Sequence, residues 1–138
     1  MPATAVFAPG ANALITGAAS GVGLAIARLC QSKGMNILLV DRNAEALEAA
    51  RKELSGGDST IAASVTDVSS PADWAKLKNV AAEMLGTIEL LVLNAGTGMR
   101  GTWGDEDYFR NVSSPIRRMP SHEYHINLSR RLRPICLA

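Results

Sequence analysis

The chain has 138 residues, which is one domain's worth of polypeptide and enough to enclose a hydrophobic core. A hydrophobic content of 47% excludes general disorder, and no apolar run approaches the roughly 20 residues that span a bilayer. With a net charge of +1 and no positively charged leader, the sequence favours a soluble, cytoplasmic protein without a membrane partner.

Charge is divided unevenly along the chain. Residues 1–112 carry 9 Lys and Arg against 12 Asp and Glu, or −3, whereas residues 113–138 carry 5 against 1, or +4. Hydrophobic periodicity also ends near Val112. We therefore expect a folded domain over residues 1–112 and an irregular basic tail over residues 113–138.

In chain order, short β-branched or leucine-rich runs alternate with longer amphipathic runs, the pattern of βαβ units in a parallel sheet. Gly34 suits the left-handed position that ends a helix, Asn43 and Ser70 suit helix N-caps, and Glu48 stands four residues before Lys52, the spacing of a helix ion pair. The predicted fold is α/β, a doubly wound parallel sheet of about four strands and three helices. Strands are predicted at 12–16, 36–40, 60–65 and 88–93, and helices at 22–33, 44–54 and 71–85.

Three glycines cluster where the first strand gives way to the first helix, in the sequence LITGAASGVG at 14–23. The first N–H groups of a helix are unpaired and point outward, with the positive end of the helix dipole behind them. Gly17 would permit the tight turn, Gly21 would let a phosphate approach the backbone, and Gly23 would let the helix pack closely on the strand. A glycine triplet also fits an ordinary surface turn, but its place between strand and helix favours pyrophosphate binding.

Asp41 ends the second strand, 24 residues after Gly17 (41 − 17). An acidic residue about 20 residues after such a turn accepts hydrogen bonds from the adenosine ribose, and its charge would repel a 2′-phosphate. This favours NAD over NADP. Arg42 leaves the choice open, because an arginine beside the ribose can accommodate that phosphate. The alternative is that residues 41–43 form only a polar turn and a helix cap.

Two further motifs follow in order, Asp67-Val68 after the third strand and Asn94-Ala95-Gly96 after the fourth. With the TGxxxGxG pattern at 16–23, they resemble the short-chain dehydrogenase/reductase family from residue 11 to about 112. The resemblance implies a Rossmann-type fold and an NAD(P)-dependent oxidoreductase that oxidises alcohols or reduces carbonyls, with Asp67 on the adenine. The cofactor-binding residues that it implies are Gly17, Ser20, Gly21, Val22, Gly23, Asp41, Arg42, Asp67, Val68, Asn94, Ala95 and Gly96.

The family's catalytic residues have no counterpart in the sequence. The family uses a tyrosine four residues before a lysine, which lowers the pKa of the phenol so that it can exchange a proton with the substrate. Tyr108 and Tyr124 are followed at that spacing by Val112 and Leu128, and no lysine follows Lys78. We therefore assign no catalytic residue and expect a truncated form that keeps the dinucleotide-binding half and is inactive alone.

Residues 113–138 match none of the family's motifs. We hypothesise that they are an out-of-frame or alternatively spliced end. The family's usual dimer interface would then be missing, and the exposed edge of strand 88–93 would permit self-association. The alternative function is a non-catalytic module that senses a nucleotide or binds a partner.

Two weaker patterns occur in the same segment. His122, Glu123 and His125 fall one residue short of the HExxH zinc motif, and even with Cys136 as a third ligand we predict no metal site. Five arginines could attract nucleic acid, but without interleaved aromatic residues or a recognition fold we expect none to be bound. The expected partner is the dinucleotide cofactor. The arginines lie at 117, 118, 130, 131 and 133.

Overall fold

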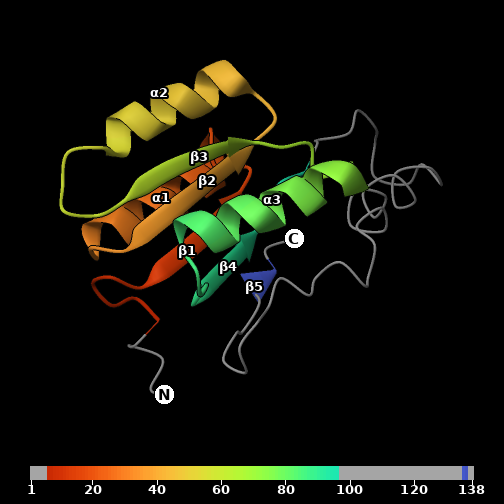
Figure 1. Ribbon diagram of the computed structural model, residues 1–138. Coiled ribbons are helices and arrows are strands. Elements are labelled where there is room, and N and C mark those ends of the chain that lie inside the picture. The colour runs from red at the N-terminus through yellow and green to blue at the C-terminus, as the bar shows by residue number, and fades with distance from the viewer. Residues whose placement is uncertain (1–5, 97–134, 137–138) are drawn as a thin grey trace, which may run out of the picture.

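A computed structural model describes residues 6–96 and 135–136, which form a parallel sheet with helices on both faces (Figure 1). The strands lie in the order β3-β2-β1-β4-β5, and every neighbouring pair is parallel. The predicted α/β fold is confirmed, with helices and strands within two residues of the expected bounds. The elements are β1 (Asn12–Thr16), α1 (Gly21–Ser32), β2 (Asn36–Asp41), α2 (Ala44–Leu54), β3 (Ile61–Val65), α3 (Pro71–Met84), β4 (Leu90–Leu93) and β5 (Ile135–Cys136).

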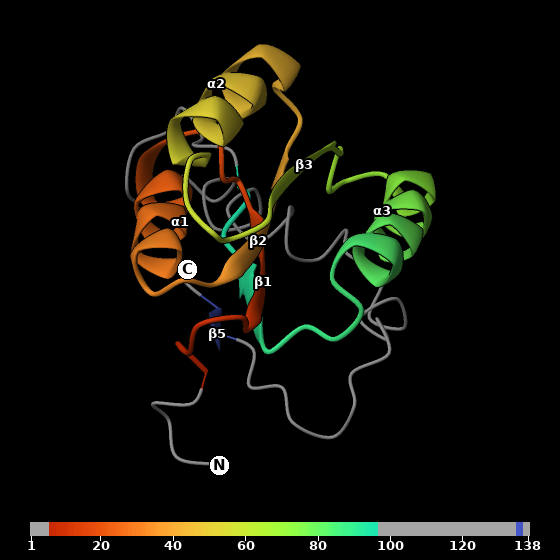
Figure 2. The ribbon, with the colours of Figure 1, turned by 60° about the vertical axis from the view of Figure 1, so that its left-hand side comes forward.

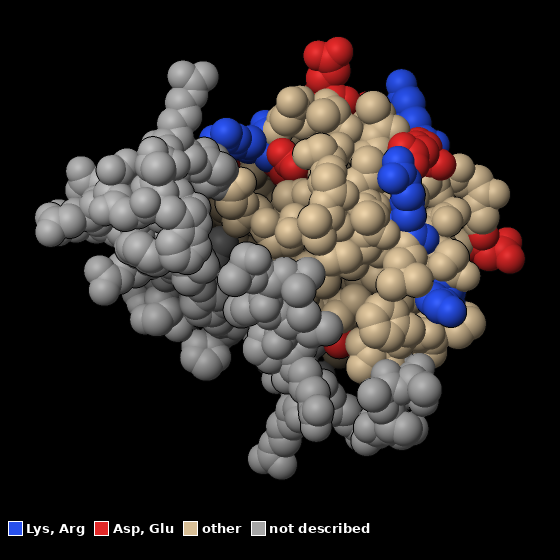
Figure 3. All heavy atoms as spheres, turned by 180° about the vertical axis from the view of Figure 1, so that it is seen from behind, with Lys and Arg blue, Asp and Glu red and all other residues tan. Residues whose placement is uncertain are grey.

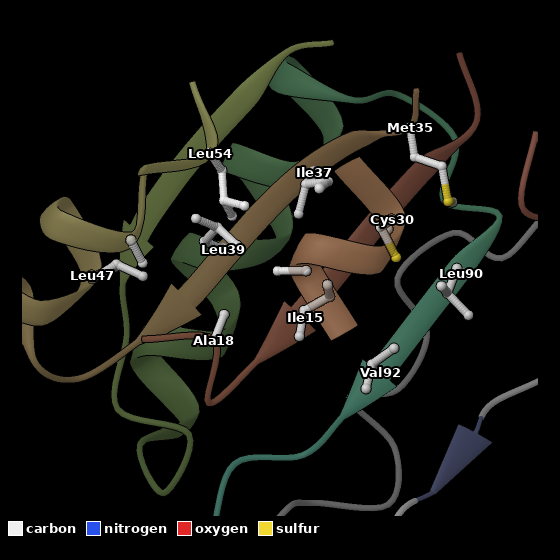
Figure 4. Packing of buried hydrophobic residues seen from close by; sticks show 13 residues of the cluster. Ile15, Ala18, Cys30, Met35, Ile37, Leu39, Leu47, Leu54, Leu90 and Val92 are labelled. Carbon is white, nitrogen blue, oxygen red and sulfur yellow. The ribbon is translucent and has the colours of Figure 1, made fainter. Parts of the chain in front are cut away.

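The helices divide between the two faces of the sheet, with α1 and α2 on one face and α3 on the other (Figure 2). Because side chains alternate along a strand, each strand from β1 to β4 contributes to both layers. Ile15 and Leu39 pack with α1 and α2, as Figure 4 shows, whereas Leu14 and Leu38 pack with α3. β1, β2 and β4 therefore read as nearly continuous apolar runs, because both of their faces are buried.

The predicted helix boundaries follow from local signals that the structure confirms. Gly34 has a φ of +72° just after α1, a conformation that glycine adopts without steric cost. The side chain of Asn43 accepts a hydrogen bond from the Ala46 N–H at 3.0 Å, and Ser70 caps α3 in the same way.

A network of asparagine side chains lies at the amino-terminal edge of the sheet, where the strands begin. Asn12 and Asn36 are register partners in β1 and β2, and their side chains are hydrogen-bonded at 3.0 Å. Asn36 Oδ1 also accepts from the Thr60 N–H, and the Asn12 N–H donates to the Glu89 carboxylate at 2.7 Å. The starts of the strands are thereby tied to one another.

Acidic and basic side chains are interspersed on the side of the molecule seen in Figure 3, rather than gathered by sign. Arg28 on α1 binds Glu53 on α2 at 2.6 Å. Within α2, Glu48 forms its direct ion pair with Arg51 at 2.7 Å, and Lys52, at the predicted spacing, acts on it only through the weaker attraction of its charge. Within the described part of the chain, no helix is long and apolar enough to cross a membrane.

The structure differs from the sequence-based expectation at the edge of β4. Residues 113–138 were expected to be irregular and that edge to be open, but Ile135 and Cys136 form β5 and pair with Val92 and Leu93. An apolar, β-branched segment fits beside an edge strand whose backbone groups need partners. The edge of β4 is thus paired over two residues. The remainder of the basic tail lies outside the described residues.

Candidate functional site

The four sequence motifs meet at the carboxyl edge of the sheet. Parallel strands end at the same edge, and the register pairs Thr16 with Val40 and Asp41 with Val65. The turn after β1, the end of β2 and the segments after β3 and β4 are therefore neighbours. They meet at the carboxyl ends of β1 and β4, the two neighbours between which the strand order changes direction, and open α/β sheets bind their ligands at this position.

The glycine turn is open on one side and closed on the other. Gly17 and Gly21 have φ values of +65° and +56°, in the left-handed region that favours glycine. A Cβ on Gly23 would lie 2.7 Å from the carbonyl carbon of Gly17 and 2.8 Å from Asn94 Nδ2, whereas a Cβ on Gly21 would meet nothing within 4 Å. The helix thus lies directly against the strand exit, and a ligand that approaches Gly21 meets bare backbone.

The first turn of α1 differs from those of the other two described helices. Asn43 and Ser70 cap α2 and α3 with their side chains, and the carboxylates of Glu45 and Asp73 stand in the first turns. Ser20 makes no such cap, and the first turn of α1 holds no acidic residue. Unpaired N–H groups at the positive end of the helix dipole form an anion site.

Asp41 lies between the glycine turn and the start of α2. Its Oδ2 accepts a hydrogen bond from the Ala19 N–H at 3.1 Å, and its Oδ1 accepts one from the Asn43 N–H at 3.1 Å. The structure therefore brings this predicted residue into direct contact with the glycine turn. The neighbouring Arg42 is exposed to solvent.

The predicted pair Asp67 and Val68 is held in place by α3 and its cap. Hydrogen bonds from the Ser69 hydroxyl and N–H, and in lesser part the charge of Arg42, hold the pKa of Asp67 below its usual range. The exposed carboxylate is thus ionised at neutral pH. The Trp74 indole N–H donates to the Val68 carbonyl at 2.8 Å, so this segment is fixed to α3.

Thr16 joins the exit of β1 to the segment after β4, a role that the sequence analysis missed. Its side chain is fully buried, and Oγ1 accepts hydrogen bonds from the N–H groups of Asn94 and Ala95 at 3.0 Å each. Asn94 Nδ2 in turn donates to the Gly17 carbonyl at 3.4 Å. The signal available in the sequence was a polar residue at the end of an otherwise apolar, buried strand.

Other predicted residues are less constrained. Val22 is 59% exposed, and Gly96 is exposed with open space around it. Tyr108 and Tyr124 lie outside the described residues, as do the histidines considered for a metal site. Among the residues that the structure describes, no three His, Cys, Asp or Glu side chains could hold a metal ion.

Comparison with known proteins identifies the family. The family model for short chain dehydrogenases matches residues 11–119, and the chain belongs to this family. The 3-ketodihydrosphingosine reductase of Bos taurus is 38% identical over 104 residues, which are 70% of this chain and 31% of that protein.

Two solved structures have the same arrangement. L-sorbose reductase from Gluconobacter frateurii, complexed with NADPH and L-sorbose, is 30% identical with a TM-score of 0.68, over 81% of this chain and 45% of that one. A short chain dehydrogenase/reductase from Burkholderia phymatum in complex with NAD is 31% identical with a TM-score of 0.66, over 80% and 41%.

The chain corresponds to only part of each relative, and the family match covers only part of the chain. The chain spans about a third of the length of the curated relatives and under half of the solved chains. Within this chain, the family match extends to residue 119, which is seven residues (119 − 112) past the boundary expected at Val112.

Proposed function

We propose that the chain binds a nicotinamide dinucleotide at the carboxyl edge of its sheet, as the cofactor-binding segment of an alcohol or carbonyl oxidoreductase. The observation that carries this proposal is the open first turn of α1. Its N–H groups have no side-chain cap, and bare backbone at Gly21 permits close approach of a pyrophosphate. Similar proteins whose structures contain NADPH or NAD support the same class of ligand.

Each part of the dinucleotide has candidate residues at this edge. The pyrophosphate would lie over Gly21 and the start of α1, and the adenosine ribose would face Asp41 at the end of β2. The adenine would lie between that strand end and the Asp67-Val68 segment, where the exposed Asp67 carboxylate offers a hydrogen-bond acceptor. Thr16 would hold the floor of the site through its bond to Asn94, and residues 94–96 would border the ligand.

We propose further that NAD is preferred to NADP. The carboxylate of Asp41 stands beside the glycine turn and would repel a 2′-phosphate on the adenosine ribose. Arg42 opposes this preference, but its side chain is exposed to solvent, whereas the carboxylate of Asp41 is bonded to the glycine turn. NAD should therefore bind more tightly, with NADP as the weaker ligand.

The bound nicotinamide would supply or accept the hydride of the reaction. The remaining chemistry, proton exchange with the substrate oxygen, needs the family's tyrosine and lysine, and the 138 residues hold no lysine after Lys78. We therefore propose that this chain binds cofactor but does not turn over by itself. The origin of residues 113–138 stays a prediction. A transcript with the family's catalytic half in another reading frame would support it.

Thermal unfolding of the purified chain alone, with NAD and with NADP tests the proposal. A ligand present at a hundredfold excess over its dissociation constant adds about 2.7 kcal/mol of stability. We expect a cooperative transition that NAD raises more than NADP does. A transition that responds to neither ligand would refute the binding function, and an equal response to both would refute only the preference.

A second candidate is a non-catalytic module that binds a partner, or a second copy of itself, at the edge of β4. It is favoured by the shortness of β5, which pairs with two of the four residues of β4. Copurification with a stoichiometric partner would support this role. A monodisperse monomer that is stabilised by NAD would favour the first proposal.

A further inference from the structure

Two hydrogen bonds tie the glycine turn to the end of β2. The Ala18 N–H donates to the Val40 carbonyl at 3.1 Å, and the Ala19 N–H donates to Asp41 Oδ2 at the same distance. The first is a backbone contact that survives most substitutions. The second uses a side chain, so a single substitution can remove it.

On the basis of the proposed dinucleotide site, we infer that Asp41 is a positioning residue as well as a residue that faces the ribose. It positions the pyrophosphate cradle, by which we mean the backbone of residues 19–21 at the start of α1. Its carboxylate draws the Ala19 N–H toward β2 before any ligand is present. The residues that follow, Ser20 and Gly21, then lead into α1 with their backbone open to the ligand. Gly17 and Gly21 both adopt left-handed backbone conformations, which makes the turn permissive, so its bonds to neighbouring segments, that of Asp41 among them, help to select one conformation.

Charge and positioning predict effects of opposite sign. A carboxylate close to an anion site repels the anion, so charge alone predicts that removal of Asp41 strengthens pyrophosphate binding. Loss of the tether predicts weaker binding, because the cradle must then be ordered when the ligand arrives. Inorganic pyrophosphate separates these effects from ribose recognition, since it has no ribose.

Two variants of the full chain isolate the tether. Asp41→Asn and Asp41→Ala remove the same charge, but only asparagine keeps an oxygen that can accept from the Ala19 N–H. We expect Asp41→Asn to bind pyrophosphate about tenfold more tightly than Asp41→Ala, and at least as tightly as the original chain. Asp58→Ala, an exposed carboxylate at the opposite edge of the sheet, is the control for loss of a remote charge. Equal affinities of the two Asp41 variants in calorimetric titration would overturn the inference.

Amide hydrogen exchange in the original, ligand-free chain gives a second measurement that needs no variant to fold. The Ala19 N–H should exchange at least tenfold more slowly than the N–H of Gly21, because only the former is bonded within the protein. Equal exchange rates would overturn the positioning role even if NAD binds. Slow exchange at Ala19 in a chain that binds neither NAD nor pyrophosphate would instead refute the proposed function and leave the tether standing.

Discussion

Thr16→Val tests the contact that holds the segment after β4 against the glycine turn. Valine has nearly the shape of threonine but no hydroxyl, so the substitution removes an acceptor, and a donor to the Val92 carbonyl at 3.4 Å, without opening a cavity. The side chain is fully buried, and the N–H groups of Asn94 and Ala95 both lie 3.0 Å from Oγ1. Both donors would lose their partner at once.

The expected loss can be worked from these contacts. A buried donor left without an acceptor costs about 1–3 kcal/mol. Asn94 and Ala95 are only partly buried, so water can reach them and the low end of that range applies. We expect Thr16→Val to lower the free energy of unfolding by about 2 kcal/mol. Thr16→Ser keeps the oxygen and loses one buried methyl group, which costs about 1 kcal/mol.

Urea unfolding followed by circular dichroism measures both variants. Thr66→Val is the matched control, since Thr66 is also buried but its hydroxyl bonds the Ser64 hydroxyl, which can turn to another partner. We expect this control to lose less stability than Thr16→Val. If Thr16→Val were no less stable than Thr16→Ser, with unchanged denaturant dependence, the two hydrogen bonds would not matter and the reasoning would fail.

Three further predictions concern single positions. Gly23→Ala should lower the free energy of unfolding by at least about 3 kcal/mol, because its Cβ would meet the backbone of the turn. Gly21→Ala should lower it by only about 1–2 kcal/mol, through backbone strain, yet should weaken NAD binding at least tenfold. Urea unfolding and NAD titration separate them, and equal stability losses would contradict the geometry. Burial raises the pKa of the Cys30 thiol from its ordinary value of 9.0 to about 11. The buried neutral thiol contributes its full stability below pH 9, and this contribution disappears as the pH rises toward 11. Cys30→Ala should therefore flatten the fall in the free energy of unfolding between these two pH values. If the fall were unchanged, other groups would be its cause. Ser70→Ala should lower stability by about 1 kcal/mol through loss of the α3 cap, and no change in the urea midpoint would show that the cap is dispensable.

The helices and strands of residues 11–93 could be predicted because their signals are local. Gly34, Asn43 and Ser70 mark helix ends through bonds to residues within a few positions, and these bonds are present. The partner of Glu48 could not be predicted, since residues three and four positions on are both within reach on a helix surface. Nor could β5, because two residues carry no periodicity.

The position of the candidate site was predictable, but its internal contacts were not. The motifs at the strand ends locate it, since parallel strands end at one edge. The partners of Thr16 lie 78 and 79 residues away, and the partner of Asp41 lies 22 residues away. Hydrogen bonds of this kind depend on tertiary packing, which spacing along the sequence does not specify.

The place of β1 in the sheet sets an order of events for a chain that emerges from the ribosome amino terminus first. Asn12 binds Asn36, 24 residues away, on one side and Glu89, 77 residues away, on the other. Closing the longer loop costs about 1 kcal/mol more in chain entropy. The pairing of β1 with β2 can therefore form early, while the edge of β1 that receives β4 stays open until residues 90–93 have been made. During that interval one edge of the apolar β1 has no partner, so a nascent chain can pair there with other chains.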